Sequence, residues 1–184
     1  MLLNKITVLD KGYIAPLSFS GNGRLLQEIQ DEFFKTSVNL KLLNIASATL
    51  VIKCPLYVQM NLSQSGLSII STPSDDVEAY IPDVSMISGE SLEDRQNIQK
   101  YMQVTTEALL LNQKSMTMDG CSRFTAQLLT PISAYSTIIV HGNLNTWIDF
   151  LNQKKIPREI ANYRNEIYEV LKIEWANLDN LMKL

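Results

Sequence analysis

The sequence predicts an α+β fold in a single domain over residues 1–184, with early strands and several later helices packed on the sheet. Two runs rich in β-branched residues, "KITVLDKGYIAPLSF" and "ATLVIKCPLYVQM", fall in the first third of the chain, whereas helical spacing of apolar residues dominates from residue 92 onward. A chain of 184 residues with 46% hydrophobic residues is long enough and apolar enough for one core. Strands followed by helices are typical of the α+β class.

The first sixty residues show two strand patterns separated by helical ones. Residues 5–19 alternate around a Lys-Gly turn and predict a hairpin. Apolar residues at helical spacing predict a helix over 21–34 and a second short helix over 38–47. The second strand pattern covers 48–60, and we expect Pro55 to stop or bend it, because proline has no N–H for the ladder.

The middle of the chain contains the longest helical pattern. Residues 62–76, "LSQSGLSIISTPSDD", are polar and interrupted by glycine and proline, so we predict a loop. Residues 92–112 place apolar side chains on one side of a helix, and a further helix is predicted over 121–129, ending before a proline. Residues 134–141, "AYSTIIVH", are expected to be extended.

The C-terminal quarter predicts two amphipathic helices. Asn143 is well placed as N-cap of a helix over 144–151, whose apolar residues recur at i, i+3, i+4 and i+7. Pro157 suits the first turn of a last helix, where proline is tolerated. One apolar face of that helix is formed by Ile160, Tyr163, Ile167, Val170 and Leu171.

The composition excludes several classes of protein. The net charge is −3 and the isoelectric point ≈ 5.2, so the chain lacks the broad basic face of a nucleic-acid-binding protein. No apolar run reaches the length of a membrane span and no signal peptide is evident, so we expect a cytoplasmic protein without a membrane partner. Cys54, Cys121 and His141 are too few for a zinc tetrad, and both thiols are expected to be core residues rather than catalysts.

Short motifs do not identify a reaction. Glycines at 21 and 23 in "GNGRLL" begin a dinucleotide fingerprint, but its third glycine position is Leu26. "SQSG" lacks the preceding glycine of a nucleophile elbow. His141 could act as a general base near neutral pH or be structural at a strand end, and both interpretations stay open. An acidic cluster matches no calcium loop and favours a solvated turn; it comprises Asp75, Asp76, Glu78 and Asp83.

Several segments, in the same order over residues 7–165, resemble those of the flavin-dependent thymidylate synthases. "VLDKGYIAPLSFSGNG" is similar to the family's opening strands, and "VIKCPLYVQM" to the strand and helix start before its signature motif. "EAYIP" is similar to the Tyr-Ile-Pro segment that follows, and "FTAQLLTPISAYS" to the Glu-x-Ala-Arg-x-x-Leu-Pro helix with its tyrosine. "GNLNTWIDFLNQK" resembles the Asn-x-Arg-Ser-Leu helix, and "IPREIANY" the Ala-Gln-x-Glu-Ile-Arg helix.

This resemblance implies an α+β protomer that assembles as a homotetramer. In the family, FAD lies at subunit interfaces beside deoxyuridine monophosphate (dUMP). Reduced flavin supplies the hydride and a folate supplies the one-carbon unit, while the protein positions them without a covalent nucleophile. FAD, a folate and a pyrimidine nucleotide are therefore the ligands that the resemblance implies for this chain.

The chain departs from the family where cationic residues would contact flavin and phosphates. Ungapped counting puts Gln64 and Ser65 at the first two positions of the signature Arg-His-Arg. Gln127 and Asn145 replace the arginines of two helix motifs, whereas Asn143 keeps its motif residue near the flavin ring. The resemblance implies a cofactor site with Asn143, His141, Gln64 and Ser65, and a substrate site with Gln127, Tyr135 and Asn145.

Two functional hypotheses follow from these departures. Each lost charge-assisted hydrogen bond forfeits about 1.5–3 kcal/mol, so three or four together remove most of a micromolar affinity for phosphate ligands. One hypothesis is a diverged enzyme that binds flavin or a pyrimidine nucleotide with fewer phosphates, for related one-carbon or redox chemistry. The other is an inactive homologue that serves as a structural subunit or as the partner of an active homologue. Asn143 fits both, as a retained flavin contact or as a helix cap.

Overall fold

The computed structural model describes most of the chain, namely residues 5–21, 44–72, 78–175 and 178–182. It contains two compact units, one built around a β-sheet and one mainly helical. The sheet unit comprises Met1–Cys54, Val58–Pro73 and Ser136–Leu184. The helical unit comprises Pro55–Tyr57 and Ser74–Tyr135. The helices predicted over 21–34 and 38–47 lie almost entirely outside the described residues.

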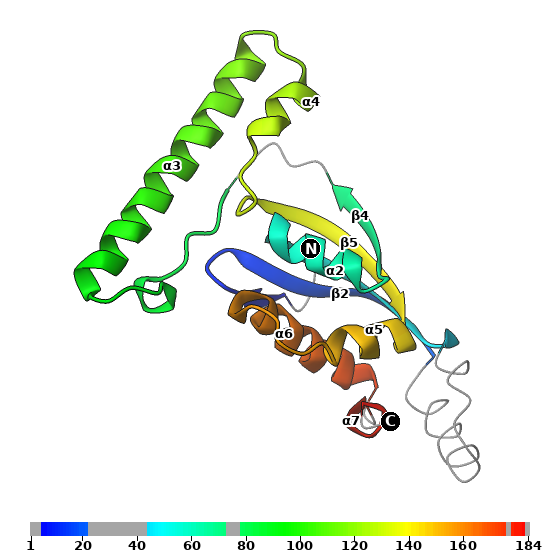
Figure 1. The fold of residues 1–184 in the computed structure, drawn as a ribbon. Helices are drawn as coiled ribbons and strands as arrows, with labels where there is room; N and C mark the ends of the chain where they lie inside the picture. The colour runs from blue at the N-terminus through cyan, green and yellow to red at the C-terminus, as the bar shows by residue number, and fades with distance from the viewer. Residues whose placement is uncertain (1–4, 22–43, 73–77, 176–177, 183–184) are drawn as a thin grey trace, which may run out of the picture. The chain divides into compact units, whose positions relative to one another are not determined.

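The sheet unit is organised around a five-stranded antiparallel sheet (Figure 1). Neighbouring strands lie in the order β1-β2-β3-β5-β4, so the late strand β5 is inserted between β3 and β4. Together with the helices, this sheet confirms the predicted α+β class. The strands are β1 (Ile6–Val8), β2 (Gly12–Ser20), β3 (Ser47–Pro55), β4 (Ser68–Thr72) and β5 (Tyr135–Asn143).

The predicted N-terminal hairpin and the strand that ends at Pro55 are both confirmed. β1 and β2 pair antiparallel, with Val8 opposite Gly12. β2 continues against β3, and its register shifts between Pro16 and Ser18. Proline explains this irregularity, because a residue without an N–H is tolerated in a strand chiefly at an edge or a bulge.

The prediction of a loop over residues 62–76 is wrong for the central residues. Ser68–Thr72 form β4, which pairs with β5 from Ser68 opposite His141 to Thr72 opposite Thr137. The segment contains only two adjacent isoleucines and is polar elsewhere, so its own pattern is weak. Pairing with β5 supplies the backbone hydrogen bonds that make it a strand. Residues 73–77 of the predicted loop lie outside the described part of the chain.

Two helices of the sheet unit, α5 (Leu144–Leu151) and α6 (Arg158–Glu174), pack on one face of the sheet. Trp147 Nε1 donates a hydrogen bond to the carbonyl oxygen of Ala48 in β3 at 3.3 Å, and Tyr163 Oη donates to that of Lys53 at 2.9 Å. Both late helices have the predicted buried faces, and Asn143 is the N-cap of the first. The helices are α2 (Leu56–Gln64), α5 (Leu144–Leu151), α6 (Arg158–Glu174) and α7 (Leu178–Leu181).

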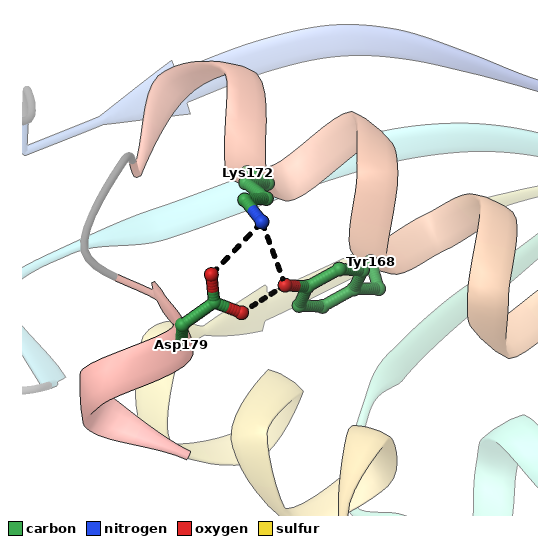
Figure 2. Close-up of polar contacts among 3 residues, drawn as sticks. All are labelled: Tyr168, Lys172 and Asp179. Atoms are coloured by element: carbon green, nitrogen blue, oxygen red, sulfur yellow. Dashed lines mark hydrogen bonds and ion pairs between the residues drawn. The ribbon is translucent and has the colours of Figure 1, made fainter.

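The C-terminal helix α7 is attached to α6 by three polar side chains (Figure 2). Lys172 Nζ lies 2.8 Å from Asp179 Oδ2 and donates to Tyr168 Oη at 3.1 Å. The Tyr168 hydroxyl also donates to Asp179. The hydrogen bonds from Lys172 to Asp179 and to Tyr168 raise the pKa of the ammonium group above its usual value. The Lys172–Asp179 ion pair is exposed to solvent, so we expect it to add little to the free energy of unfolding.

The described part of the helical unit consists mainly of one long helix and three short helical elements. Its α3 begins at a capping box, in which the Ser91 side chain accepts from Asp94 N–H and Asp94 accepts from Ser91 N–H. The helix predicted over 92–112 therefore exists and continues for six more residues. No described helix of either unit is long and apolar enough to span a membrane. The elements are η2 (Val84–Met86), α3 (Leu92–Met118), α4 (Arg123–Ala126) and η3 (Gln127–Leu129).

Candidate functional site

The turn between α2 and β4 lies against the start of α5. Gly66 has a φ of 76°, a left-handed conformation that glycine adopts without strain. A Cβ atom built on Gly66 would lie 3.8 Å from Thr146 Cγ2. Residues 64–66 are therefore close to the helix that Asn143 caps.

A polar cluster joins this turn to the C-terminal end of α5. Ser65 Oγ accepts a hydrogen bond from Gln153 Nε2 at 2.6 Å and donates to the carbonyl oxygen of Asn61 at 3.2 Å. Arg164 Nη1, from α6, donates to the main-chain carbonyl of Gln153 at 2.8 Å. All three side chains are half-buried. We refer to them as the Ser65–Gln153–Arg164 cluster.

The amide of Gln153 has unused hydrogen-bonding capacity. Its Oε1 atom is buried and accepts no hydrogen bond from the described residues, and the same holds for Asn61 Oδ1. The two ends of an amide are assigned from their partners, and either orientation leaves one end of Gln153 without a partner. A buried polar atom in this state costs about 1–3 kcal/mol. A bound molecule with a suitably placed polar group would remove that cost.

Asn143 serves as a helix cap. Its Oδ1 accepts from Thr146 N–H and from Thr146 Oγ1, both at 2.9 Å. The N–H of Leu144 donates to the carbonyl oxygen of Ala46 at 2.8 Å, so two of the first three amides of α5 are already paired. Asn145 follows in the same turn and is half-buried. This end of α5 therefore has little capacity left for an anion.

His141 lies on the other face of the sheet. A Cβ on its neighbour Gly142 would contact Leu67 and, at 3.3 Å, Trp147 Nε1 of α5, so Gly142 faces the helices. Side chains alternate along a strand, which directs His141 away from them. There His141 Nδ1 forms a 2.9 Å hydrogen bond with Thr49 Oγ1. The structure thus separates His141 from Ser65, although both were expected to contact the cofactor.

The predicted substrate residues Gln127 and Tyr135 belong to the helical unit. Gln127 is exposed at the junction of α4 and η3. Tyr135 is buried at the start of β5, and its N–H donates to the Glu78 carbonyl at 2.7 Å. Gln64, by contrast, is an exposed residue at the end of α2 in the sheet unit.

The remaining reactive groups have structural roles. Cys54 is buried in β3, and burial raises the pKa of its thiol, which confirms it as a core residue. Asp83 caps η2, and the hydrogen bonds from the N–H and side chain of Ser85 lower the pKa of its carboxyl group. Among the described residues no group of acidic, histidine and cysteine side chains could hold a metal ion. Asp75 and Asp76 lie outside those residues.

Comparison with known proteins identifies the type of fold. The sequence matches no protein-family model and none of the curated protein sequences. Among solved structures, the chain is similar to the crystal structure of a UMP/dUMP methylase, PolB from Streptomyces cacaoi, bound with 5-Br UMP. The TM-score is 0.74 at 14% sequence identity, over 96% of this chain and 97% of that chain. The fold is thymidylate-synthase-like. The likeness confirms the predicted fold, and at this identity it concerns the fold alone.

Sequence reasoning missed Gln153 and Arg164. Gln153 lies two residues beyond the end of α5, at a position to which the resembled Asn-x-Arg-Ser-Leu motif assigns no residue. Arg164 belongs to the polar side of α6, where a lone arginine ordinarily indicates only a solvated surface. Their roles emerge only when Ser65, far away in the sequence, is placed beside them.

Proposed function

We propose that the chain binds a pyrimidine nucleotide or nucleoside at the Ser65–Gln153–Arg164 cluster. The observation that carries this proposal is the fold shared with a UMP/dUMP methylase over nearly the full length of both chains. Ser65 supports it as well, since ungapped counting assigns this residue to the second position of the resembled family's signature motif. The unpaired amide oxygen of Gln153 adds a second argument from chemistry.

A carboxamide is well suited to a uracil ring. Gln153 Oε1 can accept from the N3–H of uracil, while the second N–H of Nε2 can donate to a ring carbonyl. Turning the amide toward a ligand breaks only its bond to Ser65, and side-chain changes of this size are common on binding. Such a pairing would give the buried Gln153 Oε1 a hydrogen-bond partner.

Arg164 is the cation of this cluster. One of its five N–H donors binds the carbonyl oxygen of Gln153, which holds the guanidinium near the amide. A single arginine can pair with one phosphate, whereas the resembled family uses several cationic groups. We therefore propose a ligand with no more than one phosphate at this site.

Replacing Gln153 with alanine is expected to weaken binding of both UMP and uridine by about tenfold, because two hydrogen bonds to the base are lost. Isothermal titration calorimetry of the native chain and the variant measures this ratio. Equal affinity in the two proteins would rule out base recognition by Gln153. A native chain that binds neither ligand at millimolar concentration would contradict the proposed function itself.

Two further variants distinguish recognition of the base from recognition of the phosphate. Arg164→Ala should weaken the binding of UMP but leave the affinity for uridine nearly unchanged, because only UMP carries a phosphate. Gln99→Ala removes an amide of the helical unit that donates to the carbonyl of Pro82 at 2.8 Å, and it should change neither affinity. A similar loss of affinity in Gln99→Ala would indicate that the substitutions act through folding of the chain.

FAD and a folate remain predictions from the resemblance, and Asn143 provides the test for flavin. Asn143→Ala removes the cap and should lower the free energy of unfolding by about 1 kcal/mol, whereas Asn143→Asp keeps an acceptor for the α5 amides. Flavin fluorescence quenching should be titrated with both variants. If Asn143→Ala binds flavin more weakly and Asn143→Asp binds it as well as the native chain, Asn143 acts as a helix cap. A loss in both variants indicates a direct contact with flavin.

A further inference from the structure

A small open cavity lies where the N-terminal hairpin meets helix α6, and we call it the β1–α6 cavity. Its volume is about 200 Å³. Pockets for drug-sized ligands measure roughly 300–1,000 Å³, so this one suits a single functional group rather than a nucleotide. None of its lining residues belongs to the Ser65–Gln153–Arg164 cluster. They come from the hairpin and from α6 of the sheet unit, and they are Thr7, Val8, Leu9, Asn162, Asn165 and Glu166.

The polar side chains that α6 presents to this cavity have unused hydrogen-bonding capacity. Asn162, Asn165 and Glu166 lie at i, i+3 and i+4 of the helix, so they are neighbours on its surface. None of the three side chains forms a hydrogen bond or an ion pair with a described residue. The carboxylate of Glu166 belongs to a half-buried residue. A carboxylate that is partly removed from water loses hydration, and a bound cation would compensate for that loss.

The hairpin side of the cavity supplies further acceptors. β1 is the edge strand of the sheet, so one row of its main-chain groups has no strand partner among the described strands. Its carbonyl oxygens can accept hydrogen bonds, as can the amide oxygens of Asn162 and Asn165. No lysine, arginine or histidine is among the described residues that line the cavity. The lining therefore combines one negative charge with several neutral acceptors.

We propose that the β1–α6 cavity binds a guanidinium group. This group is planar and always charged, and in arginine it has five N–H donors, enough for the Glu166 carboxylate and for neighbouring neutral oxygens together. It is more weakly hydrated than an ammonium group, so it loses less on leaving water. A calcium ion fits the lining less well, because it takes about 6–8 oxygen ligands, commonly from several carboxylates, and only one carboxylate lines the cavity.

Titration of the isotope-labelled full chain with N-acetyl-arginine amide, followed by NMR, tests the proposal. The backbone amide signals of residues 7–9 and 162–166 should shift and saturate at millimolar ligand. The matching citrulline derivative has a similar shape without the charge, and the lysine derivative has an ammonium group. We expect each of these two to bind about tenfold more weakly. Unshifted signals with the arginine derivative would overturn the proposal, and so would equal affinity for the citrulline derivative.

Three variants test the role of the carboxylate, and their NMR spectra show whether each is folded. Glu166→Gln removes the charge with little change in size and should weaken binding of the arginine derivative by about tenfold. Glu169→Gln is the matched control, because Glu169 is exposed on the same helix but does not line the cavity. Asn162→Asp adds a second carboxylate and should tighten binding, a gain that does not depend on the folding of Glu166→Gln. Unchanged affinity in Glu166→Gln, or an equal loss in Glu169→Gln, would overturn the proposal.

A blocked tripeptide with a central arginine distinguishes two sources of the guanidinium group. If the ligand is an arginine side chain of another protein, the tripeptide backbone can also pair with the edge of β1. It should then bind more tightly than the single arginine derivative and shift the amide signal of Ile6 as well. Equal affinity of the two compounds indicates a free guanidino compound. Both outcomes support a guanidinium site, and neither depends on nucleotide binding.

Discussion

Replacing Trp147 with alanine is expected to lower the free energy of unfolding by about 3–5 kcal/mol, the usual range for a buried tryptophan. Trp147 is fully buried between α5 and the sheet, and its ring lies edge-on to Phe150 at a centroid distance of 6.3 Å. The variant loses this packing and the hydrogen bond to Ala48 together. Urea unfolding followed by circular dichroism measures the change. Small domains are stable by about 5–15 kcal/mol, so the loss approaches the whole of that stability at the lower end.

Two further variants locate the source of the effect. Trp147→Phe keeps most of the ring but removes the indole N–H, and it should cost clearly less than alanine. Ile173→Ala removes a side chain that is 77% exposed in α6 and should change stability by less than about 0.5 kcal/mol. A loss below about 1 kcal/mol for Trp147→Ala would contradict the packing of α5 on the sheet.

Gly12→Ala is expected to lower the free energy of unfolding by about 2–4 kcal/mol, because the backbones of the neighbouring strands leave no space for a methyl group. A Cβ at this position would lie 2.7 Å from the carbonyl oxygen of Val8 and 2.9 Å from that of Lys53, and it would overlap the hydroxyl of Tyr163. Both oxygens belong to strands next to β2, so relief requires the sheet to move. Thermal unfolding of the native and variant chains gives the difference.

Tyr163→Phe separates the two parts of this effect. It removes the hydroxyl that donates to Lys53, which should cost about 1 kcal/mol by itself. In the double variant the side-chain overlap is gone, so the combined loss should be smaller than the sum of the single losses. Simple additivity would show that Gly12 is required only by the two backbone oxygens. A stable Gly12→Ala protein would mean that α6 packs elsewhere.

Arg164 is the one cation among the three residues of the proposed Ser65–Gln153–Arg164 site, which limits the chemistry that this site could support. Neutral amide and hydroxyl groups recognise a base through hydrogen bonds, but they do not neutralise a polyphosphate. His141 is on the other face of the sheet, and the Cys54 thiol is buried and protonated. A reaction at this cluster would therefore depend on groups that the ligand or a cofactor brings.

The amphipathic helices were predictable because their information is local. Apolar residues of α5 and α6 recur at helical spacing, and the same residues are buried in the structure. Asn143 was assigned as a cap from its position alone, and its Oδ1 does accept from Thr146 N–H. The family resemblance likewise indicated a fold that the likeness to a UMP/dUMP methylase then confirmed.

Strand β4 and the polar cluster were not predictable, because both depend on partners distant in sequence. β4 is a strand through its pairing with β5, about seventy residues later. Ser65 was singled out by resemblance, but the hydrogen bond from Gln153 links positions 88 residues apart. The separation of His141 from Ser65 follows from strand alternation, which becomes informative only once the register of β5 is known.

The sequence by itself determined the α+β class, the buried faces of the two late helices, and the existence of the long helix α3. These features are periodic over a few residues, and local sterics and hydrophobicity are sufficient to specify them. The tertiary structure decided which polar side chains meet and which face of the sheet His141 occupies. Those outcomes depend on strand order and helix packing, where residues far apart in the chain become neighbours.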